Sequence, residues 1–237
     1  MSRFPLLTVL VMTLGVAHSA AASSVQPAPR TPSVADVRST LASMPRGDVQ
    51  RGKQLNQSLM CASCHGDDGV APTQNWASLA GQRAAYTYKS LLDYQTGGRH
   101  ENDRATLMRV AVKGMSRQDM ADVAAYYASL AAVAAPAPQL DKAAHAHAER
   151  LARRGDPTRL LTPCASCHGA AGQGGLNETP ALAGQSVGSF VRTMQDYREG
   201  RRVTDANQGM RQFAERLTME EIHDLAAYYA RMGKKPR

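Results

Sequence analysis

The hexapeptide Cys-Ala-Ser-Cys-His-Gly occurs twice in this chain of 237 residues, at 61–66 and again at 164–169. The pattern Cys-x-x-Cys-His is the attachment signature of a c-type haem. Each cysteine can form a thioether to the porphyrin edge, and the histidine that follows is placed to ligate the iron. A thioredoxin-like redox pair and half of a zinc site are the alternatives. Neither alternative requires the following histidine, and neither explains two identical copies.

The two halves of the chain resemble each other well beyond the hexapeptide. Leu-Ala-Gly-Gln occurs at 79–82 and 182–185, Asp-Tyr at 93–94 and 196–197, and Ala-Ala-Tyr-Tyr at 124–127 and 226–229. The first two pairs are separated by 103 residues and the last pair by 102, so one residue has been deleted between them. This constant offset indicates an internal duplication.

Both halves carry helix signals and no strand pattern. Asp48 is a good N-cap for a helix ending near Leu59, and a second helix is expected from Arg83 to Tyr94. Ser116 followed by Asp119 predicts a capping box at the last helix of the first half. The second half repeats this order, with a helix from about 140 to 153 and a capping box at 218–221. We therefore predict an all-α chain of two small domains, each too short of apolar surface to fold well without its haem.

Composition divides the chain further. The charged Arg3, an apolar run over 6–17 and three alanines at 20–22 predict a signal peptide over 1–22. Residues 23–45 are rich in Ser, Pro and Ala and read as a mobile leader. The two domains are then expected at 46–133 and 140–237, joined by a small-residue linker at 134–139 that contains Pro136 and Pro138.

Export suits haem attachment, and we expect a periplasmic location. The apolar run at 6–17 is too short to span a bilayer, which takes about 20 residues. The formal net charge of +8 is carried by side chains of both signs, without a basic stripe that would indicate nucleic acid. An acidic protein partner, an anionic membrane surface and a simply solvated charged face all fit this charge.

The internal repeat also selects candidates for the sixth iron ligand among 11 methionines. Met108 and Met210 are separated by 102 residues, each precedes an arginine, and each follows a polar stretch expected to be a loop. His/Met ligation raises the potential of a haem. His100 is a weaker candidate because its counterpart is Val203, and we expect the remaining histidines at 145, 147 and 223 to be solvated.

Residues 46–233 resemble the cytochrome c4 family, whose members join two class I cytochrome c domains in tandem. The resemblance rests on the paired hexapeptides, the two Leu-Ala-Gly-Gln segments, the Met-Arg pairs and the Ala-Ala-Tyr-Tyr endings. It implies two covalent haems in domains related by a pseudo-twofold axis, with propionates near their shared interface. The family's haem residues carry over to Cys61, Cys64, His65 and Met108, and to Cys164, Cys167, His168 and Met210. A proline usually holds the proximal histidine through its carbonyl. Pro180 fits that role, whereas the first half has Ala77 at the equivalent position, and Pro72 or no proline would have to serve.

The resemblance implies a periplasmic electron carrier that takes electrons from a quinol-oxidising complex and passes them towards a terminal oxidase, at the outer face of the inner membrane. An enzyme such as a dihaem peroxidase is not expected, because catalysis at a metal needs a vacant coordination site. The alternative is a dihaem electron-transfer subunit of a periplasmic dehydrogenase of the sulfide- or alcohol-oxidising type. Its haem domains would have the same sequence features.

Overall fold

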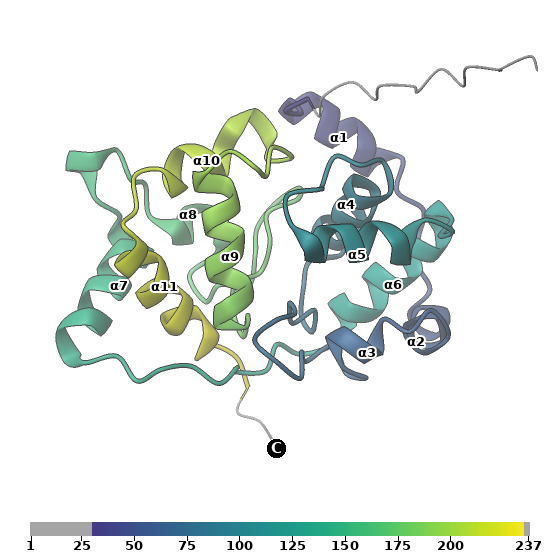
Figure 1. Cartoon of the computed structure of the whole chain (residues 1–237), viewed down its shortest axis with the longest axis horizontal. Coiled ribbons are helices and arrows are strands. Elements are labelled where there is room, and N and C mark those ends of the chain that lie inside the picture. Colours follow the sequence, from purple (N-terminus) through teal and green to yellow (C-terminus); the bar gives the residue numbers. More distant parts are fainter. Residues whose placement is uncertain (1–29, 235–237) are drawn as a thin grey trace, which may run out of the picture.

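The computed structural model describes residues 30–234, and the predicted signal peptide lies outside them. The described chain forms two helical bodies side by side (Figure 1). The first contains α2 (Val49–Ser58), α3 (Ala62–His65), α4 (Ala84–Gln95), α5 (Asp103–Val112) and α6 (Arg117–Ser129). The second contains α7 (Lys142–Arg154), α8 (Cys164–His168), α9 (Val187–Arg198), α10 (Gly209–Ala214) and α11 (Met219–Ala230), with short 3-10 turns η1 (Pro157–Arg159) and η2 (Ala206–Gln208). None of the helices in this part of the chain is long and apolar enough to cross a membrane.

Capping side chains set the helix limits as the sequence predicts. The Asp48 carboxylate accepts a hydrogen bond from the Arg51 amide at the start of α2. Complete capping boxes begin the last helix of each domain, from Ser116 with Asp119 and from Thr218 with Glu221. Each box satisfies amide groups that the helix itself leaves without partners. The last helix of each domain, α6 and α11, therefore begins at an equivalent position of the repeat.

Each domain has a hydrophobic core of its own. The N-terminal core centres on Tyr88, Met120 and Tyr127, and the C-terminal core on Ile222, Leu225 and Tyr229. One face of α6 is buried, and the equivalent face of α11 is buried in the same way; these faces consist of Met120, Val123, Ala124 and Tyr127, and of Ile222, Leu225, Ala226 and Tyr229. The structure is thus two separate packing units, as the duplication indicates.

The leader is not the irregular segment that its composition suggests. Residues Val34–Ala42 form a helix, α1, which starts with a capping box between Ser33 and Asp36. Val37 is buried, and Leu41 and Met44 pack against the N-terminal core. The Ser-x-x-Asp spacing is itself a helix-start signal. The prediction of a mobile leader is therefore wrong for residues 34–42.

The position of the two candidate methionines also differs from expectation. We expected a polar loop to lead to each of them, but Asn102 caps α5 through its side chain and Met108 lies inside that helix. Met210 lies in α10, directly after η2. Asn at an N-cap is favourable because its oxygen accepts from the first free amides of the helix. The loop before Met108 is therefore shorter than predicted.

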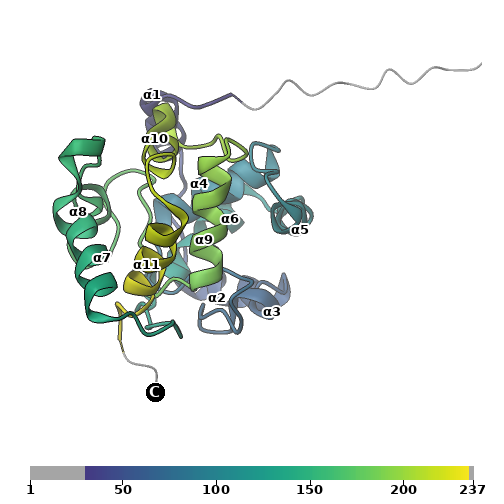
Figure 2. The same ribbon diagram turned by 60° about the vertical axis from the view of Figure 1, so that its left-hand side comes forward.

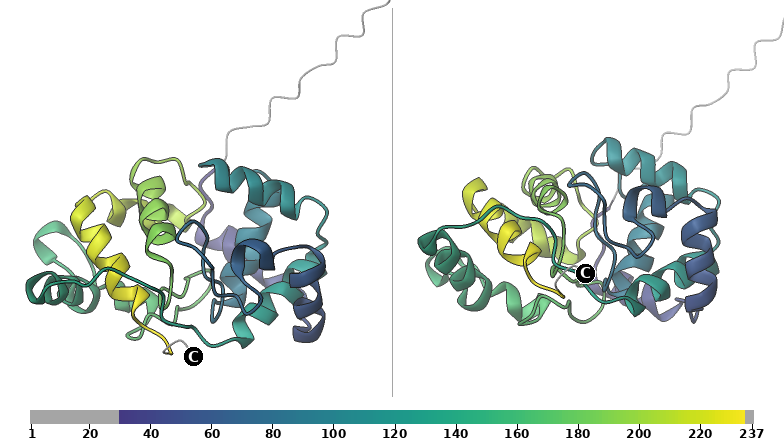
Figure 3. Two further views of the ribbon diagram at one scale, coloured as in Figure 1. Left: turned by 60° about the horizontal axis from the view of Figure 1, so that its bottom comes forward. Right: turned by 90° about the horizontal axis from the view of Figure 1, so that it is seen from below.

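Repeat-equivalent contacts join the two domains. Gln82 donates from Nε2 to the Ala181 carbonyl at 3.1 Å and accepts from the Ala181 amide at 2.7 Å. Gln185 makes the same pair of bonds with Ser78, at 3.1 and 2.8 Å. Ser78 and Ala181 are themselves equivalent positions, so the interface is pseudo-twofold. The linker follows the lower edge of the molecule (Figure 3). The Ala134 amide donates to the Lys234 carbonyl at 2.8 Å, which joins the linker to the C-terminal end of the described chain.

Candidate functional site

The two Cys-x-x-Cys-His motifs form short helices, α3 and α8, on corresponding sides of the two domains. Each helix ends at a glycine in the left-handed region, Gly66 with φ 81° and Gly169 with φ 80°. A Cβ atom on Gly66 would lie 2.1 Å from the Val70 carbonyl oxygen, so only glycine fits there. The tight turn that follows reverses the chain directly after the histidine and leaves the imidazole inside the domain.

Both motif histidines are buried and oriented by a backbone carbonyl. His65 Nδ1 lies 2.8 Å from the Ala77 carbonyl oxygen, and His168 Nδ1 lies 2.9 Å from that of Pro180. Burial lowers the pKa of both imidazoles, so each is neutral, with its proton on Nδ1 donated to the carbonyl. The Nε2 lone pair is then free, and His65 Nε2 is buried without a hydrogen-bond partner among the described residues. A neutral imidazole held in this way is suited to bind a metal ion through Nε2.

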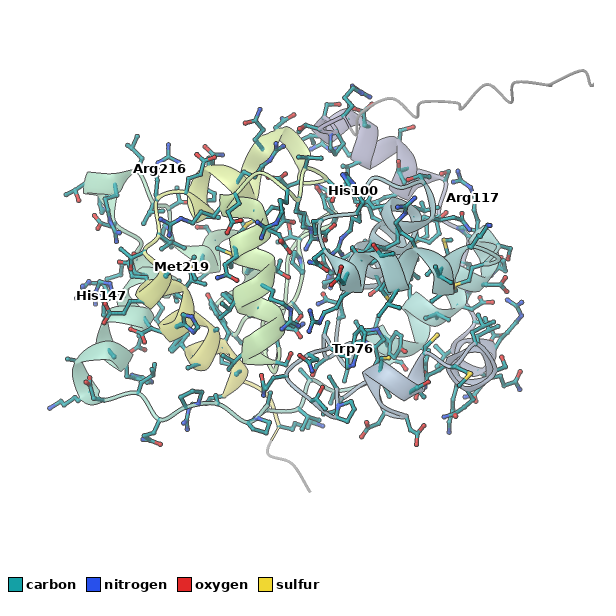
Figure 4. The ribbon with its side chains drawn as sticks, viewed as in Figure 1. Trp76, His100, Arg117, His147, Arg216 and Met219 are labelled. Carbon is teal, nitrogen blue, oxygen red and sulfur yellow. The ribbon has the colours of Figure 1, made fainter. Side chains whose placement is uncertain are left out.

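The first histidine is thus held without a proline. Of the two alternatives, Pro72 or no proline, the second is correct, because the Ala77 carbonyl makes the same bond as the Pro180 carbonyl. The two environments still differ, because the Trp76 ring contacts His65 edge-on at a centroid distance of 6.3 Å, and the equivalent residue in the second domain is Thr179. Figure 4 shows Trp76 in the N-terminal domain near the domain boundary.

The two candidate methionines occupy equivalent places beside the two cores. Met108 packs against the N-terminal core and Met210 against the C-terminal core, and both are partly buried. The methionines at 115, 120 and 194 are buried in the cores, as expected for side chains that fill gaps. The assignment of Met108 and Met210 as iron ligands stays a prediction from the repeat.

The remaining histidines have other surroundings. His100 and His223 are exposed, as expected. His147 is not simply solvated, because its Nε2 lies 2.9 Å from a carboxylate oxygen of Glu221 at the outer side of the C-terminal domain (Figure 4). His145 contacts the Tyr228 ring edge-on. These two contacts are structural, and no hydrogen bond or ring contact within residues 30–234 joins any of the four histidines to His65 or His168.

The cysteines do not have the surroundings of a redox pair. None of the four forms a disulfide. Burial raises the pKa of Cys61 and of Cys164, whereas a reactive dithiol depends on a cysteine with a lowered pKa. For the zinc alternative, the described residues contain no group of three His, Cys, Asp or Glu side chains able to hold a metal ion. Each buried histidine can supply one ligand to a metal ion, so it suits a cofactor such as a porphyrin, which provides most of the other ligands to its metal.

A pair of arginines, one from each domain, lies where the two domains meet, and the sequence reasoning missed it. Arg99 stacks on the Tyr94 ring at 4.1 Å, and Arg202 stacks on the Tyr197 ring at 4.6 Å. Arg202 is only 4 % exposed. The two arginines are separated by 103 residues, the same offset as the Leu-Ala-Gly-Gln and Asp-Tyr pairs, so the repeat would also have selected them.

The charges of this buried pair are only partly balanced. Glu101 accepts from Arg99 at 2.6 and 2.9 Å, and the Tyr86 hydroxyl lies 3.2 Å from Arg202. Arg202 Nε has no hydrogen-bond partner in the described chain. Buried cations are stable only when anions pair with them. One carboxylate does not balance the charges of two guanidinium groups. The propionates of the haems, which are expected at this interface, would supply the missing negative charge.

Comparison with known proteins gives a consistent result. The family model for cytochrome c matches residues 49–131 and 158–232. Cytochrome c4 of Thiocapsa roseopersicina is 33% identical over 77% of this chain and 91% of its own length. The thiosulfate dehydrogenase electron acceptor of Stutzerimonas stutzeri (strain A1501) is 32% identical over 75% of this chain and 81% of its own length.

Solved structures support the same relationship. Reduced recombinant cytochrome c4 from Pseudomonas stutzeri superposes with a TM-score of 0.66 at 30% identity, covering 78% of this chain and 99% of that one. A thiosulfate dehydrogenase from Marichromatium purpuratum gives a TM-score of 0.68 at 33% identity, but the match covers only 40% of that longer chain. The similarity therefore spans nearly all of a cytochrome c4 and less than half of the dehydrogenase chain.

Proposed function

Because this chain belongs to the cytochrome c family and within it to the dihaem cytochrome c4 proteins, we propose that it carries electrons through the periplasm from a quinol-oxidising complex towards a terminal oxidase. Its cofactors are two covalently attached c-type haems with His/Met axial ligation, and its partners are redox proteins. Each haem supplies a one-electron couple at its iron.

We assign the haem contacts residue by residue from the two motifs and the repeat. In each domain two cysteines would form the thioethers to the haem, and one histidine and one methionine would ligate its iron. The set is Cys61, Cys64, His65 and Met108 in the first domain and Cys164, Cys167, His168 and Met210 in the second. The carbonyls of Ala77 and Pro180 fix the tautomer and the ring orientation of the two histidines.

These assignments favour electron transfer over catalysis. With a histidine and a methionine both bound to each iron, no coordination site would be left for a substrate. Rigid surroundings keep the ligands in place when the iron changes charge, and both histidines are buried with their Nδ1 atoms already hydrogen-bonded. The protein would therefore hold the ligands of two haem irons in fixed positions. The methionine ligands would raise the reduction potentials of both haems.

The reciprocal interface is the observation that carries this proposal. Gln82 and Gln185 fix the two domains through equivalent bonds, and the buried arginines of both domains meet there. Two redox sites joined face to face form an internal relay in which an electron entering one domain leaves from the other. Export by the N-terminal signal peptide would bring the protein to the periplasm, and its net charge of +8 suits transient docking on acidic partners or on the outer face of the inner membrane.

A second function is supported by two of the comparisons. Relatives include a thiosulfate dehydrogenase electron acceptor, and part of a thiosulfate dehydrogenase has the same fold. In this alternative the chain is the dihaem electron-transfer subunit of a periplasmic dehydrogenase. The haem sites would be the same, so only the electron donor distinguishes the two functions.

One experiment separates the donors. The ferric holoprotein is mixed with membranes that contain the quinol-oxidising complex, and separately with periplasmic extract plus thiosulfate, sulfide or an alcohol. We expect rapid reduction by the membranes with a quinol substrate and reoxidation by terminal oxidase. Reduction only by the extract and one of these substrates would support the dehydrogenase subunit and contradict the respiratory carrier.

The ligand assignment has its own test. The holoprotein is expected to contain two covalent low-spin haems, and Met108→Ala and Met210→Ala are each expected to abolish methionine ligation at one haem. A high-spin ferric signal from the wild-type protein, or a methionine variant that keeps both methionine ligands, would show that the assignment is wrong.

A further inference from the structure

Residues 30–42, which we call the N-terminal strap, lie outside both segments that match the cytochrome c family. Within the strap, α1 packs on α4 of the N-terminal domain. Val37 is 2 % exposed, and Leu41 reaches the N-terminal core. The strap is therefore fixed to the first domain by apolar burial.

The residues just before α1 bind the other domain. The Asn207 amide donates to the Pro32 carbonyl at 2.9 Å, and Arg211 Nη2 donates to the Thr31 hydroxyl at 2.6 Å. Figures 1 and 2 show α1 at the top of the molecule, beside the segment that leads into α10. The strap thus bridges from α4 of the first domain to η2 and α10 of the second.

The segment that the strap contacts holds Met210 and has an unfavourable backbone. Asn207 and Gln208 have φ values of 50° and 61°, a left-handed backbone region that asparagine adopts more readily than glutamine and that strains Gln208. One carboxylate braces the next turn, since Asp205 accepts from the amides of Met210 and Arg211, both at 3.0 Å, and from Arg211 Nε at 2.9 Å. Arg211 is therefore held by Asp205 from within its own domain and by Thr31 from the strap.

The equivalent methionine needs no such support. Met108 lies in the middle of α5, a helix of 10 residues whose N-cap Asn102 has an extended backbone. No residue between 98 and 154 has a positive φ. The two methionine segments therefore differ in the one feature that the strap contacts.

We propose that the N-terminal strap positions Met210 for iron ligation, with Thr31 and Pro32 as positioning residues. The proposal rests on Met210 being the distal ligand. A thioether is a soft donor, and imidazole competes well with it for ferric iron. When the segment that carries Met210 is less firmly held, imidazole displaces the thioether at a lower concentration, and this occurs only in the C-terminal domain.

The test is an imidazole titration of the ferric holoprotein, followed by the shifted NMR signals of the two iron-bound methionine methyl groups. Met108→Ala and Met210→Ala assign each signal to its haem. Thr31→Val removes the acceptor of the Arg211 bond, and Val37→Asp detaches α1 from α4. Thr40→Val is the matched control, because the Thr40 hydroxyl bonds only within α1, to the Asp36 carbonyl.

We expect Thr31→Val to lower the imidazole concentration for half-displacement at the C-terminal haem about three- to tenfold, the effect of losing one hydrogen bond. Val37→Asp should lower it at least as much, and Thr40→Val and the N-terminal haem should be unchanged. The proposal would be overturned if a variant lowered the half-displacement concentration equally at both haems. It would also be overturned if Thr31→Val and Val37→Asp both titrated like the wild-type protein. If Val37→Asp does not fold, Thr31→Val decides alone. If Met210→Ala keeps both methionine signals, the ligand assignment itself is wrong.

Discussion

Gln82 and Gln185 are equivalent residues of the internal repeat, and each forms two hydrogen bonds with the backbone of the opposite domain. Their partners, Ala181 and Ser78, are equivalent residues as well. The same short segment therefore serves both sides of a pseudo-twofold interface. An interface built in this way fixes the orientation of the domains with few side chains.

We predict that Gln82→Ala weakens the docking of the two domains. The substitution leaves the buried Ala181 amide and carbonyl without partners, which costs about 1–3 kcal/mol. For a chain of this size, each kcal/mol corresponds to about 2–4 °C, so the thermal midpoint of the holoprotein should fall by about 2–12 °C. Gln54→Ala is the control, because Gln54 is exposed on α2. Equal midpoints for the two variants would show that the paired bonds contribute nothing to the interface.

The buried arginines should influence the reduction potentials. Oxidation adds a positive charge to a haem, and a nearby cation opposes this, so removing Arg202 should lower a potential. A unit charge about 10 Å from another contributes on the order of 1–2 kcal/mol at an effective dielectric constant of about 20. For a one-electron couple this is about 40–90 mV. We therefore expect Arg202→Gln to lower at least one potential by tens of millivolts in a spectroelectrochemical titration.

Two further variants separate charge from packing at this position. Arg202→Lys keeps the positive charge, so its reduction potentials should stay close to those of the wild-type protein. Arg154→Gln removes a charge from an exposed site, where solvent screens it, and should change little. A potential unaffected by Arg202→Gln would mean that the arginine pair does not face the haems.

The proline difference between the domains should matter little. Because the Ala77 carbonyl already holds His65 as the Pro180 carbonyl holds His168, the backbone oxygen and not the ring is what the histidine needs. Pro180→Ala should leave both haems low-spin and reduce stability by at most about 1 kcal/mol, the usual effect of freeing one backbone angle. Optical spectra and urea unfolding measure both quantities. A high-spin C-terminal haem in this variant would show that the ring itself orients His168.

The sequence predicted the features that side chains encode locally. The capping residues Asp48, Ser116 and Thr218 mark helix starts because each supplies an oxygen to amides of its own helix. The repeat added distant relationships, since two offsets were enough to align the halves. Two further features could have been found in the sequence. Arg99 and Arg202 are separated by 103 residues, one of these two offsets. Ser33 with Asp36 forms the same capping pattern as Ser116 with Asp119.

Other features could not be predicted from residue types. The Ala77 carbonyl that holds His65 belongs to the backbone, so a residue of any type could supply it. The bonds of Gln82 depend on how the second domain is placed, which no local pattern encodes. The contact between Thr31 and Arg211 joins residues 180 apart in the chain. Such contacts follow from the tertiary arrangement, and only a structure shows them.

Glu221 should make the stability of the C-terminal domain depend on pH. Hydrogen bonds from Arg159, at 2.7 and 2.9 Å, together with bonds from Thr218 and His147, lower the pKa of this carboxyl to about 2. In the unfolded chain the pKa is 4.5. The carboxylate therefore contributes its full stabilisation above pH 4.5 and loses it as the pH falls towards 2.

We predict that Glu221→Gln reduces the free energy of unfolding at pH 7 by about 2–3 kcal/mol, since one pKa unit corresponds to about 1.4 kcal/mol and part of the shift is screened by solvent. The difference from wild type should shrink between pH 4.5 and 2, because the wild-type carboxylate loses its advantage there. Urea unfolding of the holoprotein at several pH values, followed by circular dichroism, measures this. Glu220→Gln, at the exposed neighbouring position, should unfold like wild type throughout. A difference that persists unchanged at pH 2 would show that Glu221 stabilises the domain by its shape and not by its charge.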